Sequence, residues 1–296
     1  MKYFVGIDGG GSKTDFVVSN SALQVVHTVH IPKGANPWQN GLEATLEVLE
    51  EGLSQLTEYR ADTEAIVAGI GGCFSVNKFT SAIENCLKQF CLRAQLVGDL
   101  PIAFRAASDH SSGIIAIAGT GSSAVQFFSD GSHYLYDAVG CGGRDIGYWL
   151  AKAYGRDQLG EAGKDFLLQV APVLQRNELH TTADFYHNAE LRMLTKSLAV
   201  LDAKEPAFED LKFVLDLAAD RWRFKLYGIV TKFLLKEPDT SQLCLVLSGG
   251  LWKHDYFRNQ VTIALQAEFT QLDILFNPEV APTLGALRMA RDLSNK

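Results

Sequence analysis

Residues 5–18, VGIDGGGSKTDFVV, place three glycines after an acidic residue and between two hydrophobic runs. Each glycine inside a regular element destabilises it by roughly 0.5–1 kcal/mol relative to alanine. Because glycine lacks a Cβ, however, its backbone N–H group can approach an anion closely and point into a concavity. We therefore interpret this stretch as a phosphate-binding turn. Its candidate ligands are Gly9, Gly10, Gly11, Ser12, Lys13 and Thr14.

A second glycine-rich turn, AGTGSS at residues 118–123, stands at the matching place of the second half of the chain, and a third, SGG, lies at 248–250. Either of the first two alone could be an ordinary hairpin, since hairpin turns favour glycine. A lone glycine motif has low specificity, but two at equivalent places of a duplicated chain favour phosphate binding. The candidate ligands in the second turn are Gly119, Thr120, Gly121 and Ser122.

Asp8 ends the first hydrophobic run directly before the first glycine turn. A carboxylate there would repel a bare polyphosphate, but it becomes favourable when Mg²⁺ lies between them, usually through water because Mg²⁺ dehydrates reluctantly. The alternative is an aspartate that only ends a strand at a turn. We expect a magnesium–nucleotide complex as the ligand, with Asp8 assisting the metal.

The hydrophobic pattern predicts a duplicated α/β chain with the order βββαβαβα in each half. Strands are expected at 2–8, 13–20, 23–31, 64–72 and 94–99, with helices from Asn40 to about Thr57, around 79–90 and from about Pro101. The second half is expected to have strands within 113–140, at 243–250 and at 272–276, with helices at 255–269 and from about Pro282. A helical insertion is expected at about 146–237. We place the domains at 1–110 and 111–296 and leave open that the final helix packs back on the first domain.

Composition limits the partners and the compartment of the protein. The chain has 296 residues, 47% of them hydrophobic, and a formal net charge of −7. This charge argues against a nucleic-acid partner, because such proteins usually present a basic face. We find no run long enough to cross a bilayer and no room for a signal segment before Tyr3, so we expect a cytoplasmic protein. The five cysteines lack the spacing of a metal site and are expected to be buried, reduced thiols.

The motifs GIDGGGSKT, GIGG, GD at 98–99, IAGTGSS, LSGGLW and APTLGALRMA together resemble the sugar kinase/Hsp70/actin superfamily. The resemblance runs nearly end to end and is strongest to the BadF/BadG/BcrA/BcrD-type ATPase group, which includes N-acetylglucosamine kinases. It implies two ribonuclease-H-like, actin-like ATPase domains with ATP in the cleft between them. It also implies that the glycine turns hold the phosphates, that Gly249 and Gly250 border the adenosine, and that Gly71 and Gly72 belong to the sugar site.

The resemblance implies a catalytic base at Asp99, which would accept the proton of the attacking sugar hydroxyl. The alternative is a helix N-cap ahead of Leu100 and Pro101. Asn36 in KGANPW fits the asparagine that hydrogen-bonds the sugar in similar kinases, although Asn-Pro could simply start a turn. Trp38 could stack on a sugar face, but an aromatic residue at a helix start more often packs in the core.

The stretch VGCGGRDIGYWLAKAYG at 139–155 departs from the family pattern, because its loop is shorter and an acidic pair is missing. Asp145 either replaces a sugar-binding aspartate or starts a helix through an ion pair with Arg144. This departure leaves the identity of the sugar open.

We therefore expect an ATP- and Mg²⁺-dependent kinase for an amino sugar such as N-acetylglucosamine or glucosamine. A rival hypothesis is an ATPase that activates a dehydratase or reductase through an iron–sulfur cluster at a dimer interface, which needs thiolates at a shared surface. Cys141 lies near a glycine loop, but no second cysteine accompanies it. The chain could also be a sugar-responsive regulator, or a homologue that has lost activity through the altered 139–148 loop. A homodimer is left open.

Overall fold

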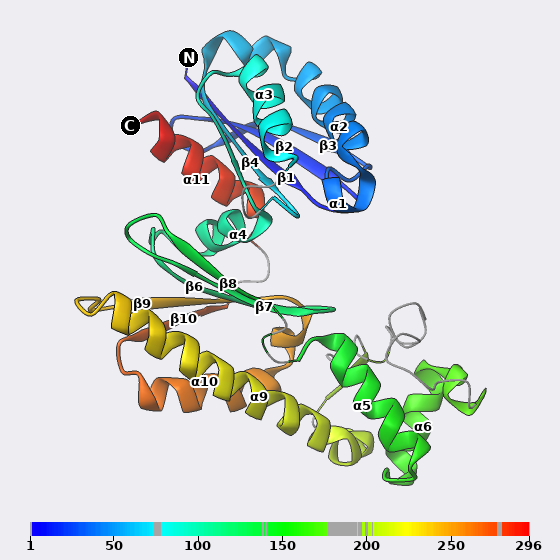
Figure 1. Ribbon diagram of the computed structural model, residues 1–296. Helices are drawn as coiled ribbons and strands as arrows, with labels where there is room; N and C mark the ends of the chain where they lie inside the picture. The colour runs from blue at the N-terminus through cyan, green and yellow to red at the C-terminus, as the bar shows by residue number, and fades with distance from the viewer. Residues whose placement is uncertain are drawn as a thin grey trace. The chain divides into compact units, whose positions relative to one another are not determined.

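The computed structural model describes residues 2–73, 78–137, 139, 141–176, 194, 197, 198, 201, 202, 204–276 and 280–295. The chain divides into two compact units, Met1–His110 with Glu279–Lys296, and Ser111–Pro278. Residues 279–296 thus group with the first unit; the sequence had placed them in the second domain and left open that the final helix packs back on the first. Each unit contains one five-stranded sheet with helices (Figure 1).

The sheet of the first unit has the strand order β3-β2-β1-β4-β5. Its strands are β1 (Tyr3–Gly9), β2 (Thr14–Asn20), β3 (Val25–Ile31), β4 (Thr63–Ile70) and β5 (Ala94–Val97). The first three are antiparallel, whereas β1, β4 and β5 are parallel. The other elements of this unit are α1 (Pro37–Asn40), α2 (Leu42–Ser54), η1 (Thr57–Asp62), α3 (Thr80–Phe90), α4 (Asp99–Ala107) and α11 (Pro282–Ser294).

The central strands of this sheet carry apolar side chains on both faces, and helices cover both faces. One face, with Val5 and Phe16, packs with the buried side chains of α2 and α3. The opposite face, with Phe4 and Val17, packs with Ile102 of α4 and with α11. Asp8 follows Phe4 at an even spacing, so it lies on the α4/α11 face at the end of β1.

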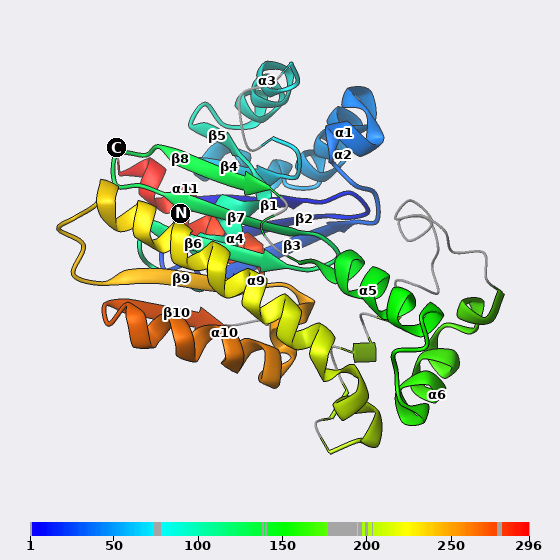
Figure 2. The ribbon, with the colours of Figure 1, turned by 60° about the horizontal axis from the view of Figure 1, so that its bottom comes forward.

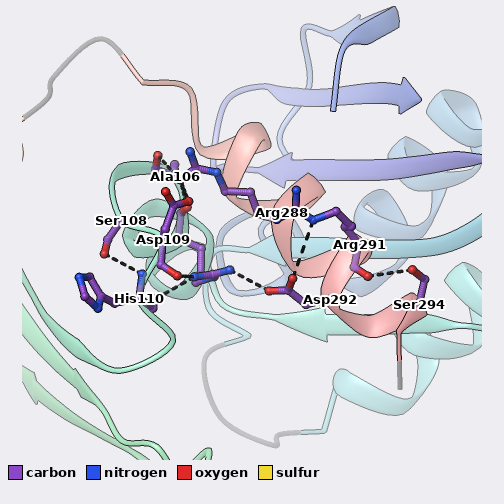
Figure 3. A network of polar contacts seen from close by, with 9 residues as sticks. Ala106, Ser108, Asp109, His110, Arg288, Arg291, Asp292 and Ser294 are labelled. Carbon is purple, nitrogen blue, oxygen red and sulfur yellow. Dashed lines mark hydrogen bonds and ion pairs between the residues drawn. The ribbon is translucent and has the colours of Figure 1, made fainter. Parts of the chain in front are cut away.

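The final helix, α11, is fastened to α4 by close packing and by arginines. A Cβ at Gly285 would lie 1.8 Å from the carbonyl oxygen of Ile102, so the two helices approach backbone to backbone. Arg288 donates to the carbonyl oxygens of Arg105 (2.9 Å) and Ala106 (3.2 Å). Figure 3 shows Arg288, Asp292 and the segment around Asp109 and His110 in this network.

The second unit repeats the topology of the first, with the order β10-β9-β6-β7-β8. Its strands are β6 (Gly113–Ala118), β7 (Ser122–Phe127), β8 (His133–Asp137), β9 (Leu243–Ser248) and β10 (Leu272–Phe276). Strands β6, β7 and β8 correspond to β1, β2 and β3, and β9 and β10 correspond to β4 and β5. This correspondence confirms the predicted duplicated α/β fold.

Several helices of the second unit lie in its described residues, some of them in the expected insertion. They are α5 (Gly143–Gly155), α6 (Glu161–Val170), η2 (Pro172–Arg176), α9 (Pro206–Lys236), η3 (Gly250–Lys253) and α10 (Asp255–Glu268). Helices α9 and α10 run along the sheet in Figure 2, and their buried residues share one core with β6 and β9. The indole of Trp222 in α9 donates to the carbonyl oxygen of Cys141 at 2.9 Å. Much of the expected insertion between η2 and α9 lies outside the described residues.

Two further observations concern the chain as a whole. None of the described helices is both long and apolar enough to cross a membrane. All five cysteines are buried and take part in no disulfide, which agrees with the expectation of buried thiols.

Candidate functional site

The first glycine turn, between β1 and β2, is closed by a hydrogen bond from the Gly10 N–H to the Lys13 carbonyl (3.1 Å). Its tightness has a packing cause. A Cβ at Gly11 would lie 1.7 Å from Oε1 of Gln39, and a Cβ at Gly34 would lie 2.2 Å from the Gly11 backbone. The Gly11 backbone thus requires glycine at position 34, whereas Gln39 is exposed and its side-chain end can move away from Gly11.

Two polar side chains of this turn, Thr14 and Lys13, already have protein partners. Ser12 is exposed. Thr14 is fully buried, and its hydroxyl donates to the carbonyl oxygen of Lys33 at 2.9 Å. The Lys13 ammonium lies 2.8 Å from one oxygen of Asp15, and His30 Nδ1 lies 2.6 Å from the other. A phosphate that engages Lys13 would therefore have to share it with Asp15.

Asp8 lies directly opposite Asp15 in the antiparallel ladder, and Asp15 lies opposite His30 in the next pair. Burial raises the pKa of Asp8 to about 6, and repulsion from Asp15 and Asp99 adds to the effect, while Lys13 opposes it. A cation beside these carboxylates would favour their charged forms. This environment fits the predicted role of Asp8 beside Mg²⁺. Among the described residues, no group of three or more His, Cys, Asp or Glu side chains is placed to hold a metal by itself.

Three polar atoms converge at Gly71, which follows β4. A Cβ at Gly71 would lie 3.1 Å from Asn36 Nδ2, 3.6 Å from Asp99 Oδ2 and 3.6 Å from the Gly9 carbonyl oxygen. The Gly71 N–H donates to that same Gly9 carbonyl at 2.9 Å. We call this group of Gly71, Asn36 and Asp99 the hydroxyl cradle, because it offers one amide donor and one carboxylate acceptor around one point.

Asn36 is held in place by its other amide atom. Its Oδ1 accepts hydrogen bonds from the N–H groups of Trp38 (3.0 Å) and Gln39 (3.3 Å) and so caps α1. This arrangement satisfies the turn-starting interpretation and also orients Nδ2 toward Gly71. Both roles inferred from the sequence are therefore compatible in one side chain.

Asp99 is the first residue of α4, and Gly98 occupies the N-cap position. The side chain keeps solvent access, yet the protein atoms packed around its carboxyl raise its pKa, while backbone N–H groups at the helix start lower it. A carboxylate with a raised pKa is a better proton acceptor.

Trp38 does not pack in the core, which is the location that aromatic residues at a helix start usually take. It is 61% exposed, and its indole N–H donates to the carbonyl oxygen of Gly72 at 3.0 Å. Gly72 has φ +83°, and a Cβ there would lie 2.4 Å from the indole. Gly71 and Gly72 thus both permit close approach of a side chain from the 36–38 segment.

The second glycine turn, between β6 and β7, differs from the first. Cβ atoms at Gly119 and Gly121 would meet no atom within 4 Å, so open space lies beside the turn. The N-terminus of α5 joins it, because Gly143 donates to the Gly119 carbonyl (2.8 Å) and Arg144 to the Thr120 carbonyl (3.0 Å). A helix N-terminus attracts anions through its partial positive charge.

The turn after β9 completes this part of the second unit. Gly249 has φ +106°, and a Cβ there would lie 2.6 Å from the Ala118 carbonyl oxygen, so the two turns touch. Gly250, by contrast, borders open space. The second unit thus brings together the turn of Gly119, Thr120, Gly121 and Ser122 with Gly249 and Gly250, the residues expected to meet the nucleotide.

Asp145 acts locally in the structure. Its Oδ2 accepts a hydrogen bond from the Gly142 N–H at 2.9 Å, which caps the start of α5. This is a helix-starting role, and it is made through the backbone.

Several residues of the first unit were not predicted from the sequence. Asp15 and His30 were not considered for the site, because their alignment with Asp8 depends on the register in which three strands pair. Gly34 and Gln39 were missed because their contact with the glycine turn joins distant segments. Trp38 was considered both for stacking on a sugar face and for packing in the core, and the structure places it at the surface.

The chain is similar to known proteins in part of its sequence, although no family model matches it. An N-acetylmuramic acid/N-acetylglucosamine kinase of Clostridium acetobutylicum is 31% identical over 129 residues, which are 41% of this chain and 41% of that protein. The sequence match thus spans less than half of the curated relative.

Solved structures match over nearly the whole chain. A Chromobacterium violaceum protein assigned as an N-acetylglucosamine kinase has a TM-score of 0.63 at 21% identity, with 97% of this chain and 98% of that chain covered. A ROK family glucokinase of Streptomyces griseus, solved with glucose and AMPPNP, has a TM-score of 0.60 at 14% identity, with 98% and 99% covered. At these identities the match establishes the fold. The fold expected from the motifs is confirmed: the chain has the actin-like ATPase fold of these solved kinases, and part of its sequence is similar to that of an N-acetylmuramic acid/N-acetylglucosamine kinase.

Proposed function

We propose that the protein is an ATP-dependent sugar kinase that transfers the γ-phosphoryl group to a hydroxyl of an amino sugar such as N-acetylglucosamine or glucosamine. The observation that carries the proposal is the hydroxyl cradle, where Asn36 Nδ2 and Asp99 Oδ2 both lie within 3.6 Å of the position of a Cβ at Gly71. The partial sequence match to a kinase for N-acetylmuramic acid and N-acetylglucosamine supports it.

In this proposal the acceptor hydroxyl accepts a hydrogen bond from Asn36 Nδ2 and donates one to Asp99. The hydroxyl oxygen attacks the γ-phosphorus, the bond from that phosphorus to the β–γ bridging oxygen breaks, and ADP leaves. The hydroxyl proton passes to Asp99, whose raised pKa suits it to receive the proton. Such a base contributes typically ~10²–10⁴-fold to the rate.

The nucleotide is proposed to bind through the glycine turns. The turn at 119–122 has open space beside it and a helix N-terminus behind it, and Gly249 and Gly250 are proposed to border the adenosine. Asp8 is proposed to assist Mg²⁺ through water. When bound, Mg²⁺ would neutralise phosphate charge and help to orient the transferred group.

The test is an ADP-release assay with glucosamine, N-acetylglucosamine, N-acetylmuramic acid, N-acetylmannosamine and glucose. We expect sugar-stimulated turnover, and Asp99→Asn should lower kcat by about 10²-fold or more with little change in nucleotide affinity. Asp109→Asn, which changes an exposed aspartate beyond the other end of α4, serves as the matched control. Turnover with none of the sugars would refute the kinase proposal, and loss of nucleotide binding in Asp99→Asn would indicate a structural role for Asp99.

The cysteine chemistry argues against a cluster-bearing activator. Cys141 is fully buried, and burial raises the pKa of its thiol to about 12. A cluster held at a dimer interface needs cysteines at a shared surface, so this buried side chain is poorly suited to that role. An ultraviolet–visible spectrum of anaerobically purified protein tests the point, because a cluster would give visible absorption.

A further inference from the structure

We propose that Trp38, Lys78 and Phe79 form a subsite beside the hydroxyl cradle that binds an anionic substituent of the sugar. We call these three residues the aromatic–lysine shelf. The proposal rests on the proposed kinase function and deepens it, because it names a carboxylate-bearing amino sugar as the preferred class of substrate.

The shelf is fixed in place although it faces solvent. The Trp38 indole is held by its hydrogen bond to the Gly72 carbonyl (3.0 Å) and by an edge-to-face contact with Phe79, with ring centroids 5.1 Å apart. An exposed, ordered indole is a typical surface for sugar faces and for short apolar substituents. Its low conformational freedom reduces the entropy that binding would otherwise lose.

Asn36 links the shelf to the hydroxyl cradle. Its Nδ2 lies 3.1 Å from the position of a Cβ at Gly71, and its Oδ1 lies 3.2 Å from the position of a Cβ at Gly72. The second of these positions is also 2.4 Å from Cδ1 of Trp38. Asp99, Gly71, Asn36, Gly72 and the indole are therefore successive neighbours within the first unit, with Gly71 buried and Trp38 exposed.

Lys78 supplies the positive charge. Its ammonium lies 4.8 Å from the ring centroid of Phe79 and 5.6 Å from that of Trp38, which is a weak attraction at an exposed site. In the described part of the chain, no carboxylate lies within ion-pair distance of it. The two lysines near the first glycine turn differ in this respect, because Lys13 pairs with Asp15 and Lys33 with Glu51.

Lys78 lies in the same unit as three aspartates whose negative charge would repel an anionic substituent. Asp8, Asp15 and Asp99 make this end of the sheet acidic, and an anionic substituent would be repelled there without a cation. Lys78 offsets that repulsion, since an ion pair forms when the substituent's carboxylate meets the ammonium. A substituent that also carries a methyl group would pack on the Trp38 ring. The lactyl ether of N-acetylmuramic acid has both groups and is a suitable probe.

The experiment compares the full-length protein with Lys78→Met, Lys78→Arg and a matched control, Lys88→Met. Lys88 is an exposed lysine on α3 that pairs with Glu84 of the same helix. We expect Lys78→Met to raise the KM for N-acetylmuramic acid about tenfold, with the KM for N-acetylglucosamine changed by less than about twofold. Lys78→Arg should keep the preference because it keeps the charge, and Lys88→Met should change neither constant. Added salt should weaken the preference.

Binding is measured in parallel by tryptophan fluorescence, so that the two proposals can fail separately. If N-acetylglucosamine is phosphorylated but Lys78→Met leaves the ratio of the two KM values unchanged, the shelf proposal is wrong and the kinase proposal stands. Poor use of N-acetylmuramic acid relative to N-acetylglucosamine would overturn the shelf proposal as well. If no sugar is phosphorylated, the kinase proposal fails, and the effect of Lys78→Met on the Kd for N-acetylmuramic acid then decides for or against the shelf.

Discussion

Asp8 is a carboxylate that the fold holds where its charge is unfavourable. It is partly buried at the end of β1, and Asp15 and Asp99 repel it, so its pKa is about 6 instead of the ordinary 3.8. A group with a raised carboxyl pKa binds more protons in the folded state than in the unfolded state between these two values. The folded protein is therefore destabilised relative to the unfolded chain as the pH rises through that range.

The raised pKa predicts that Asp8→Asn stabilises the protein in the absence of divalent cations. The gain should be absent near pH 4, where Asp8 is protonated in the folded state, and should reach on the order of 2 kcal/mol above pH 7. Urea unfolding at several pH values with a chelator present measures it, and the same variant should lose activity because the carboxylate is gone. An equal effect at all pH values would show that the charge of Asp8 is not the cause.

At the scale of single elements, the two glycine turns have the same place in the topology but different reasons for their glycines. The first turn is crowded at Gly34, where a Cβ would lie 2.2 Å from the Gly11 backbone, whereas Gly119 and Gly121 border open space. A crowded glycine is needed for folding, and an uncrowded one leaves room for a ligand that approaches the backbone.

We therefore predict different results for alanine at the two turns. Gly119→Ala should change the melting temperature by less than about 2 °C, because the new methyl group meets nothing, but it should weaken ATP binding about tenfold or more by blocking a phosphate. Gly34→Ala, beside the first turn, should destabilise the protein by about 1–3 kcal/mol through overpacking, because its methyl group would lie 2.2 Å from the Gly11 backbone. Calorimetric titration with ATP and thermal unfolding measure both. Unchanged ATP affinity in Gly119→Ala would argue that this turn binds no phosphate.

At the scale of single elements, the type of most helices and strands could be predicted from the sequence, but the way they meet could not. The strands of both units and the helices α2, α3, α4, α10 and α11 were expected within a few residues, because apolar alternation and stripes fix element type. The hydroxyl cradle was foreseen only as separate candidates, Asn36, Gly71 and Asp99, since their convergence depends on how β4, α1 and α4 meet. The alignment of Asp15 and His30 with Asp8 was not foreseen, because strand register is a property of the pairing and not of one strand.

At the scale of the whole molecule, the chain leaves the first unit at residue 110, builds the second unit and returns at residue 279. The returning helix α11 supplies part of the core that covers Phe4 and Val17 of the first sheet. The first unit is therefore completed by the last residues of the chain, and the fit of α11 on α4 at Gly285 is a condition for its stability.

This dependence predicts a local effect of Gly285→Ala, whose methyl group would lie 1.8 Å from the Ile102 carbonyl oxygen. We expect destabilisation by about 3 kcal/mol or more, since backbone atoms cannot move aside as a flexible side chain can. Gly228→Ala is the matched control: it lies inside α9, a Cβ there meets nothing within 4 Å, and it should stabilise by roughly 0.5–1 kcal/mol. Hydrogen exchange should show lost protection in β1, β4 and α11 of Gly285→Ala and unchanged protection in β6 and β9. Equal loss in both sheets would mean that the two units unfold as one cooperative body and that the effect of α11 is not confined to the first unit.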